Sequence, residues 1–440
     1  WDEVESATSY ELLIDDMVYE VGNNLSFMHT DQPYNSTHTY KVRSRNEQGY
    51  SKWSAEIEAT TSQDPWRNVP TPENVIWTGG DQYGALKNAT DHDTNTMFHS
   101  TGDVVTNAVP FILDYGSAYQ LDKLEYYPRD NYGNGTVQQL DVYTSLDGVH
   151  WIQQYDGSSQ DNWTYDTGKP VTENVKTVSL TGAARYVKLV VTKSSGNFFS
   201  ANEIAVYKQD GSKAFAVGST NFESVVSLSD YTNMKQYLGT SPKDGSDFTD
   251  QIKARYGDIN NNNVYDVYDY AFTMFNLNGG TEQTGKVSGD ILLIPSNSEV
   301  NDGETFTIDV YADNVKNLNA FGEVLDYDPT AISFESVTAE YDIIQMENLT
   351  VNKNYSDEEA YLNLAFANNG NQETYSGTGV IAKITMKALT TTKVSEAIDL
   401  TDMMLIGPEF DFIEGDSYFE VQMPELAKPE SKTYQYEKDF

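Results

Sequence analysis

Short runs in which apolar and polar residues alternate recur along the chain, and such runs are typical of half-buried β-strands. Tyr and β-branched residues are frequent in them and favour a pleated surface. These runs are Ser9–Ile14, 38–45 and 52–60, then 111–114, 123–127, 140–144 and 186–191, and finally 304–310, 321–326, 331–335, 360–366 and 379–387. The pattern predicts a mainly β chain.

A helical period interrupts the β pattern at 230–238 and 266–277, and 248–255 is read as a further helix. Asn278-Gly279-Gly280 is a helix-stop signal. We therefore expect a multi-domain protein, mainly β, with three β-sandwich modules and one small α-helical calcium-binding module. The predicted segments are 1–63, 64–209, 215–281 (helical), 286–425, and a tail at 426–440.

Composition narrows the functional classes. The 440 residues include no Cys, so neither disulfides nor thiolate metal sites are available. The net charge of −39 argues against a nucleic-acid partner, because phosphate binding requires a basic face. No apolar run approaches the length of a transmembrane helix. An acidic chain of this kind favours cation binding.

The N-terminal sequence begins at Trp1 inside a strand-like pattern and shows no signal-peptide pattern. We interpret the chain as a piece of a longer polypeptide that could carry an export signal and an enzyme upstream. Two glycosylation sequons, 88–90 and 134–136, fall inside loops that we assign below to binding. They favour a bacterial host that lacks this modification, and we expect the protein to be secreted or located at the cell surface.

Residues 257–269 (GDINNNNVYDVYD) place oxygen donors at the spacing of an EF-hand calcium loop. The predicted ligands are the side chains of Asp258, Asn260, Asn262 and Asp269 and the carbonyl of Val264. Calcium is a hard cation that takes six to eight oxygens, which gives the spacing a chemical reason. The alternative is an Asn/Asp-rich turn without a metal ion.

The calcium-loop pattern recurs 39 positions earlier. Asn221 aligns with Asn260, Glu223 with Asn262, and Asp230 with Asp269, and such repetition indicates a duplicated unit. The pair of loops, each followed by a helix, resembles a dockerin, a calcium-binding module of bacterial polysaccharide-degrading enzymes. Ser219 replaces the first carboxylate, so we expect only the second loop to bind calcium well.

Residues 1–63 resemble a fibronectin type III domain that lacks its first strand. The resemblance rests on Trp1, on Tyr40 as a corner tyrosine, and on residues 46–51 (NEQGYS). Domains of this family are usually spacers.

Residues 64–209 contain 145–151 (SLDGVHW), 184–189 (ARYVKL) and 201–207 (ANEIAVY). Together they resemble a discoidin-like domain of the coagulation factor 5/8 type C family, whose bacterial form is the family 32 carbohydrate-binding module. The resemblance implies a jelly-roll fold and a calcium loop, with ligands at Asn88, Asp91, Asp93, Thr96 and Glu203. The alternatives are a solvated turn, or zinc at His92 and His99, for which no third nitrogen or sulfur ligand lies nearby.

The same resemblance implies a sugar site. His99, Arg129 and Asn134 match the polar triad of the family, Phe198 matches its aromatic platform, and Gln82 or Asp81 stands where many members have an acidic residue. An apolar platform with a few placed polar groups suits a pyranose. We expect a sugar of the galactose or N-acetylgalactosamine type, with N-acetylglucosamine next. The alternative for His99 is a satisfied core histidine. A second aromatic platform after the His is missing, since Thr101 and Gly102 stand there.

Residues 286–425 contain 317–322 (NLNAFG), 327–329 (YDP) and 332–334 (ISF), which resemble a cohesin, the β-sandwich receptor of dockerins. The resemblance implies dockerin–cohesin partners. Whether the two modules of this chain pack on each other or bind other chains is left open, and a spacer sandwich is the alternative.

Three functions compete. The first is a non-catalytic glycan-targeting and scaffolding region of a secreted bacterial glycoside hydrolase. The second is an enzyme within these residues, which we disfavour because the many carboxylate pairs carry little information and no nucleophile or phosphate motif is apparent. The third is a glycan-binding adhesin with no enzyme attached.

Overall fold

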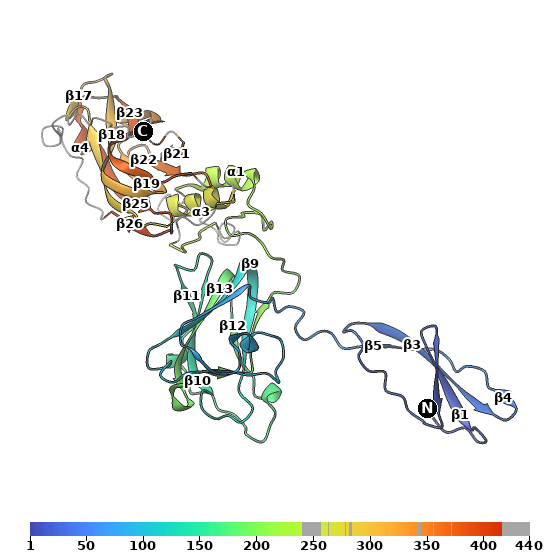
Figure 1. Cartoon of the computed structure of the whole chain (residues 1–440). Coiled ribbons are helices and arrows are strands. Elements are labelled where there is room, and N and C mark those ends of the chain that lie inside the picture. The colour runs from blue at the N-terminus through green and yellow to red at the C-terminus, as the bar shows by residue number, and fades with distance from the viewer. Residues whose placement is uncertain are drawn as a thin grey trace, which may run out of the picture. The chain divides into compact units, whose positions relative to one another are not determined.

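The structure, a computed structural model, describes residues 1–239, 257–262, 264–277, 279–280, 284–340, 343, 345–354, 356–370 and 372–415. The chain divides into two units, Trp1–Pro70 and Thr71–Phe440 (Figure 1). The helix predicted at 248–255 and the tail predicted at 426–440 lie outside the described residues. Among the described residues, no helix is both long and apolar enough to cross a bilayer.

The first unit is one antiparallel network of five strands, in the order β2-β1-β3-β4 with β5 paired to β3. Alternate residues Tyr10, Leu12 and Ile14 of β1 form its small core with Val21. Two predicted strands are confirmed, and the third, 52–60, is confirmed only in its second half. The fibronectin type III assignment stays a prediction. The strands are β1 (Ser9–Ile14), β2 (Met17–Gly22), β3 (Thr37–Asn46), β4 (Gly49–Tyr50) and β5 (Ile57–Thr60).

The second unit begins with a β-rich region at 71–208, which is built around one long strand, β9 (Pro110–Tyr127). The first part of β9 pairs with β13 and β6, and its second part pairs with β12 and β15. The prediction of two separate strands at 111–114 and 123–127 is therefore wrong. Gly116 lies between them with φ +69°, which glycine adopts without strain, and β13 pairs with the strand on both sides of this residue.

The other strands of this region complete a seven-stranded sheet, β11-β10-β13-β9-β12 with β15 and β6 on β9, and a three-stranded sheet, β14-β8-β7. A buried apolar cluster fills the space between them, including Phe111, Leu124 and Leu189. The bounds are β6 (Asn74–Trp77), β7 (Asp81–Tyr83), β8 (Phe98–Ser100), β10 (Val137–Ser145), β11 (Ile152–Tyr155), β12 (Lys176–Ser179), β13 (Ala183–Ser194), β14 (Ser200–Ala201) and β15 (Glu203–Lys208).

Residues 288–414 form a sandwich of two antiparallel sheets, β16-β18-β23-β20 and β21-β22-β19-β25-β26. Phe321 and Phe366 stack between the sheets, with ring centroids 4.8 Å apart. The bounds are β16 (Ser288–Pro295), β17 (Glu299–Val300), β18 (Thr305–Leu318), β19 (Ala320–Tyr327), β20 (Ile332–Ala339), β21 (Glu347–Asn354), β22 (Ala360–Ala367), β23 (Tyr375–Ala388), β24 (Thr392–Lys393), α4 (Val394–Ala397), β25 (Ile398–Ile406) and β26 (Phe412–Glu414).

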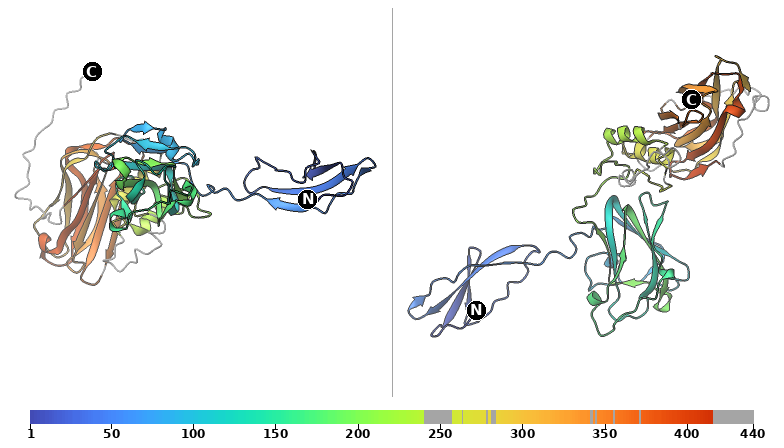
Figure 2. Two further views of the ribbon diagram at one scale, coloured as in Figure 1. Left: turned by 90° about the horizontal axis from the view of Figure 1, so that it is seen from below. Right: turned by 180° about the vertical axis from the view of Figure 1, so that it is seen from behind.

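Two helices precede this sandwich, α1 (Leu228–Tyr237) and α3 (Val267–Leu277), close to the predicted 230–238 and 266–277. Helix α3 packs on the outer face of the five-stranded sheet, against β19, β22 and β25 (Figures 1 and 2). That face is lined by small residues, because Ala320 pairs with Ala367 and Gly322 pairs with Ala365. The helical segment and the sandwich of this chain therefore pack on each other.

At Gly322 the sheet lies very close to helix α3. A Cβ there would lie 2.6 Å from the Cβ of Val267, so we expect Gly322→Ala to lower the free energy of unfolding by about 1–3 kcal/mol through overpacking. Urea unfolding measures this loss. A double variant that also carries Val267→Gly should lose less than the sum of the two single losses, because the Cβ of residue 267 that causes the clash is removed. A Gly322→Ala protein as stable as the parent would contradict the close packing.

Candidate functional site

Four of the predicted sugar-binding residues line one pocket in the 71–208 region. His99 lies on β8, Arg129 follows β9, Asn134 lies in the next loop, and Phe198 follows β13. The chain brings these four side chains together from segments up to about a hundred residues apart. Gln82 belongs to β7, and its side chain lies outside the described part of the structure.

One backbone carbonyl accepts hydrogen bonds from two polar side chains at the pocket. The carbonyl oxygen of Asn134 accepts a hydrogen bond from Arg129 Nη1 at 2.7 Å and another from Ser200 Oγ at 3.0 Å. Ser200 Oγ also contacts Nδ1 of His99. Because the hydroxyl proton goes to the carbonyl, we assign the imidazole proton to Nδ1. The Nε2 atom of His99 then keeps its lone pair and can accept a hydrogen bond from a ligand hydroxyl.

The electrostatics of the pocket favour a neutral imidazole beside a cation. Burial lowers the pKa of His99 below its ordinary value, and the positive charge of Arg129 lowers this pKa further. Among the described residues, the buried Nε of Arg129 has no hydrogen-bond partner. The pocket therefore places an acceptor on His99 beside the charged guanidinium of Arg129, a combination that suits hydroxyl groups.

Two aromatic rings border these polar groups. The Phe198 ring is stacked on His99, with centroids 5.1 Å apart and planes 22° apart. Tyr83, on β7 directly opposite His99 of β8, also lines the pocket, and 66% of its surface is exposed. Sequence reasoning looked for a second aromatic platform after His99 and missed Tyr83, because a three-residue strand has too short a pattern to predict its pairing.

Glycine permits the close approach of two loops at the pocket. Gly196, which precedes Phe198 by two residues, has φ +71°. A Cβ at Gly196 would lie 2.8 Å from Oδ1 of Asn134. Both the conformation and the clearance therefore favour glycine. This contact sets Asn134 beside the loop that carries Phe198.

The hydroxyl group of Thr96 contacts several oxygen atoms of the predicted calcium loop. Thr96 Oγ1 lies 3.0 Å from each carboxylate oxygen of Asp91, 3.0 Å from the carbonyl oxygen of Asp93 and 3.3 Å from the carbonyl oxygen of Asn88. Glu203, on β15, accepts a hydrogen bond from the backbone N–H of His92 at 2.8 Å. The loop residues and Glu203 thus form one oxygen-rich cluster.

The charge in this cluster is poorly compensated. Glu203 is fully buried, and its Oε1 has no hydrogen-bond partner among the described residues. Burial, together with the negative charge of Asp91, raises the pKa of Glu203 to about 8. An orphaned carboxylate oxygen beside carbonyl, hydroxyl and carboxylate oxygens is a donor set that fits calcium.

The family model of the F5/8 type C domain matches residues 59–204. A second model, that of the cohesin domain, matches residues 292–409. The pocket and the Glu203 cluster therefore both lie in the F5/8 type C domain, and the sandwich against which α3 packs is the cohesin domain.

Solved structures of family 32 carbohydrate-binding modules are similar to this chain. CBM32-1 of a family 31 glycoside hydrolase from Clostridium perfringens is 35% identical, with 33% of this chain and 100% of that chain covered and a TM-score of 0.30. CpGH89CBM32-5 of the same organism, in complex with GalNAc-β-1,3-galactose, is 28% identical (30% and 94% covered, TM-score 0.25). The family 32 module of its NanJ, in complex with galactose, is 22% identical (32% and 98% covered, TM-score 0.27).

The helical segment next to the cohesin domain repeats one hydrogen-bond pattern at the predicted interval of 39 residues. Asp269 accepts hydrogen bonds from the backbone N–H groups of Ile259 and Asp266, at 2.6 and 3.0 Å. Asp230 accepts them from the corresponding groups of Thr220 and Ser227, each at 2.7 Å. The two loops therefore share this hydrogen-bond arrangement, in which the last carboxylate accepts from two backbone N–H groups of its own loop.

The second of these loops contains the more acidic cluster. Asp258 accepts from the backbone N–H of Asn262 at 3.0 Å, and Oδ1 of Asn260 lies 3.3 Å from the same N–H. Oδ1 of Asn262 accepts from the N–H of Val264 at 2.8 Å. Burial, then the charges of Asp266 and Asp258, raise the pKa of Asp269. This cluster of carboxylate and amide oxygens fits a cation, and the dockerin assignment stays a prediction.

The two predicted calcium sites, in the loops 88–96 and 258–269, would each use several kinds of oxygen ligand. Across the described part of the chain, no group of three or more His, Cys, Asp or Glu side chains is placed to hold a metal ion. A cation at either loop would therefore depend on hydroxyl, amide or carbonyl oxygens in addition to carboxylates. This composition favours calcium over zinc, which prefers nitrogen and sulfur ligands.

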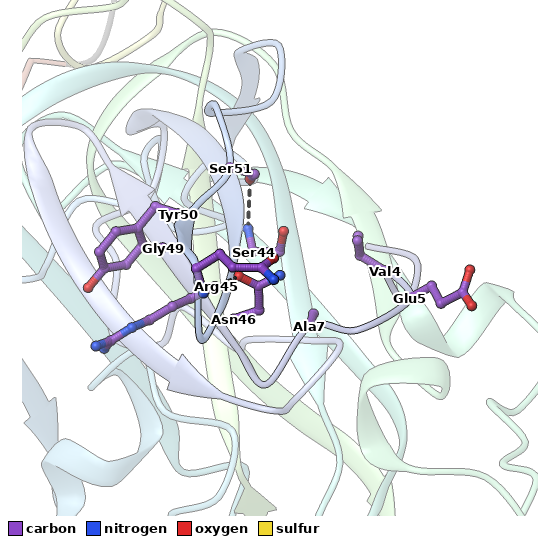
Figure 3. Close-up of a pocket in the computed structure, with 10 residues that line it drawn as sticks. Val4, Glu5, Ala7, Ser44, Arg45, Asn46, Gly49, Tyr50 and Ser51 are labelled. Atoms are coloured by element: carbon purple, nitrogen blue, oxygen red, sulfur yellow. Dashed lines mark hydrogen bonds between the residues drawn. The ribbon is translucent and has the colours of Figure 1, made fainter.

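Another hollow lies in the first unit, next to the β3–β4 turn (Figure 3). Its lining includes Arg45 and Tyr50, whose guanidinium carbon and ring centroid are 5.1 Å apart. Figure 3 shows Glu5 directed away from the other side chains. The Tyr50 ring already partners Arg45, and we assign this hollow no ligand.

Proposed function

We propose that the F5/8 type C domain binds a terminal sugar of the galactose or N-acetylgalactosamine type. The observation that carries the proposal is the convergence of His99, Arg129, Asn134 and Phe198 on one pocket. Neutral His99 supplies an acceptor, Arg129 supplies charged donors, and the Asn134 amide supplies both. The apolar face of a pyranose would pack on Phe198.

Calcium is the cofactor that we propose for the loop beside this pocket. Asn88, Asp91, Asp93, Thr96 and Glu203 would hold the ion, which would neutralise the buried carboxylates and stiffen the loop that leads into β8. The sugar contacts themselves would be made by the protein. A second calcium ion would bind the loop from Asp258 to Asp269, with Asn260, Asn262 and the carbonyl of Val264 completing the ligands.

We further propose that the region has a targeting and scaffolding role in a secreted bacterial glycoside hydrolase. One shallow sugar site is weak, and it gains most when further modules engage the same surface. A dockerin-bearing protein would be the partner of the cohesin domain. A glycan-binding adhesin without an enzyme is the alternative. Release of reducing sugar by this chain alone would overturn the non-catalytic assignment.

The Phe198 platform gives a direct test of sugar binding. Phe198→Ala should weaken galactose binding about tenfold or more, because a buried aromatic contact contributes about 1.5–3 kcal/mol. Calorimetric titration with galactose, N-acetylgalactosamine and N-acetylglucosamine measures the loss and ranks the sugars. Phe27→Ala, a half-exposed Phe in the first unit, is the matched control. Equal binding by both variants would contradict the assigned site.

A further inference from the structure

Ser200 lies behind the sugar pocket rather than on its lining. It belongs to β14, which pairs with β8 so that Ser200 stands directly opposite His99. Ser200 is fully buried, so a ligand in the pocket does not reach its hydroxyl group. Any effect of Ser200 on sugar binding must therefore act through the side chains and backbone groups that it contacts.

The surroundings of Ser200 hold its hydroxyl group in one place. The backbone N–H of Ser200 donates to the carbonyl of Gly135 at 2.9 Å, and its carbonyl accepts from the hydroxyl group of Tyr126 at 2.7 Å. A Cβ at Gly135 would lie 2.1 Å from Ser200 Oγ. Glycine at position 135 therefore leaves the space that this hydroxyl occupies.

The Ser200 hydroxyl has a single proton and two partners. It donates that proton to the carbonyl oxygen of Asn134 at 3.0 Å, because a carbonyl oxygen can only accept. Its contact with Nδ1 of His99 then requires Nδ1 to carry the ring proton of the neutral imidazole. Without the hydroxyl, a proton on Nδ1 would lose this acceptor. An unpaired buried donor is unfavourable, so the ring proton would move to Nε2.

We infer that Ser200 is a positioning residue of the sugar site, which fixes neutral His99 as a hydrogen-bond acceptor at Nε2. The sugar hydroxyl that meets His99 must then donate, so a galactoside with fluorine in place of that hydroxyl binds much more weakly. Arg129, on the same pocket, carries only donors and suits a hydroxyl oxygen that accepts. The inference rests on the proposed function, because it requires a sugar in contact with His99.

The first test compares Ser200→Ala with the parent by calorimetric titration of the full chain with methyl β-galactoside in the presence of calcium. Ser200→Ala should bind about tenfold more weakly, which is the effect of losing one hydrogen bond to the ligand. Ser145→Ala is the matched control, because Ser145 is also buried, bonds to Asp147 and Gly148, and lies outside the pocket. This control should bind as tightly as the parent.

Nitrogen NMR of the imidazole gives a readout that a loss of stability alone does not change. The His99 signals are assigned by comparison with His99→Gln. In the parent and in Ser145→Ala, the proton should be on Nδ1, whereas in Ser200→Ala it should be on Nε2. A set of galactosides with fluorine in place of one hydroxyl group then completes the comparison. The position at which fluorine weakens binding to the parent most should matter much less in Ser200→Ala.

The pH profile gives a third readout. Burial and the positive charge of Arg129 lower the pKa of His99 below its ordinary value of 6.5. From the other elements around this ring, β7 contributes Tyr83 and the loop after β13 contributes Phe198, and neither adds a charge. Protonation places a proton on Nε2, so the affinity of the parent should fall as the pH drops through this lowered pKa. The affinity of Ser200→Ala should change little, because its Nε2 already carries a proton.

The outcomes separate this inference from the sugar site itself. Equal affinities of Ser200→Ala and Ser145→Ala, or an unchanged His99 tautomer in Ser200→Ala, would overturn the role of Ser200 and leave the site in place. The parent alone decides the matter if Ser200→Ala does not fold, since a ring proton on Nε2 of unliganded His99 contradicts the inference. Failure of the parent to bind any galactoside would refute the proposed function and the inference together.

Discussion

Arg129→Ala is expected to abolish measurable sugar binding while the domain stays folded. Hydrogen bonds to charged groups contribute about 1.5–3 kcal/mol each, so the loss should be roughly 10- to 100-fold. A single weak site then falls below detection. The same change frees the Asn134 carbonyl from its bond to Nη1, so Asn134 should also lose part of its orientation. Titration with galactose measures the affinity, and calorimetric melting measures the fold.

Two controls separate the role of the guanidinium from that of its charge. Arg129→Lys keeps the positive charge without the planar fork and should lose an intermediate amount of affinity. Arg45→Ala removes an arginine from the first unit and should leave affinity unchanged. Parent-like affinity of Arg129→Ala would show that the pocket is not the sugar site.

Calcium is expected to reverse a pH-dependent loss of stability caused by Glu203. The pKa of the Glu203 carboxyl is about 8 in the folded chain, above its ordinary value of 4.5. The stabilising contribution of the protonated form is therefore complete below pH 4.5 and disappears as the pH rises through 8. In chelator, the melting temperature should fall over this range by the equivalent of a few kcal/mol, since one pKa unit is about 1.4 kcal/mol. Bound calcium should remove that fall by stabilising the ionised carboxylate.

Other buried carboxyls with raised pKa values, such as Asp266 and Glu323, contribute to the same pH range. The informative quantity is therefore the difference between the parent and Glu203→Gln. The glutamine variant should show less pH dependence in chelator and a smaller gain from calcium. Identical pH profiles for parent and variant, with and without calcium, would refute the assignment of Glu203 to a calcium site.

The alternating pattern predicted where strands lie, but it did not predict that two of the expected strands are one continuous strand. Residues 115–122 of β9 were not assigned to a strand, because Gly116 and the polar residues after it resemble a turn. The pairing of neighbouring strands makes this segment part of β9, since β13 pairs with β9 on both sides of Gly116 and β15 pairs with residues 121–127. Propensity is a weak guide where neighbouring strands supply the backbone hydrogen bonds.

The candidate site could be predicted where a motif marked it and not where tertiary contact created it. His99, Arg129 and Asn134 were found from a resemblance, and the structure gathers them around one pocket. Ser200, which connects His99 to the Asn134 carbonyl, and Tyr83 were missed. Each is positioned by strand pairing next to β8, and no local pattern in the sequence reports such a neighbour.

The face of small residues beneath α3 has a consequence for assembly. Helix α3 covers the face formed by Ala320, Gly322, Ala365 and Ala367, and its Val267 leaves no room for a Cβ at Gly322. A helix from another protein cannot share that face. A binding partner must therefore displace α3 or bind elsewhere on the cohesin domain. Binding at this face would carry the energetic cost of releasing the chain's own helix.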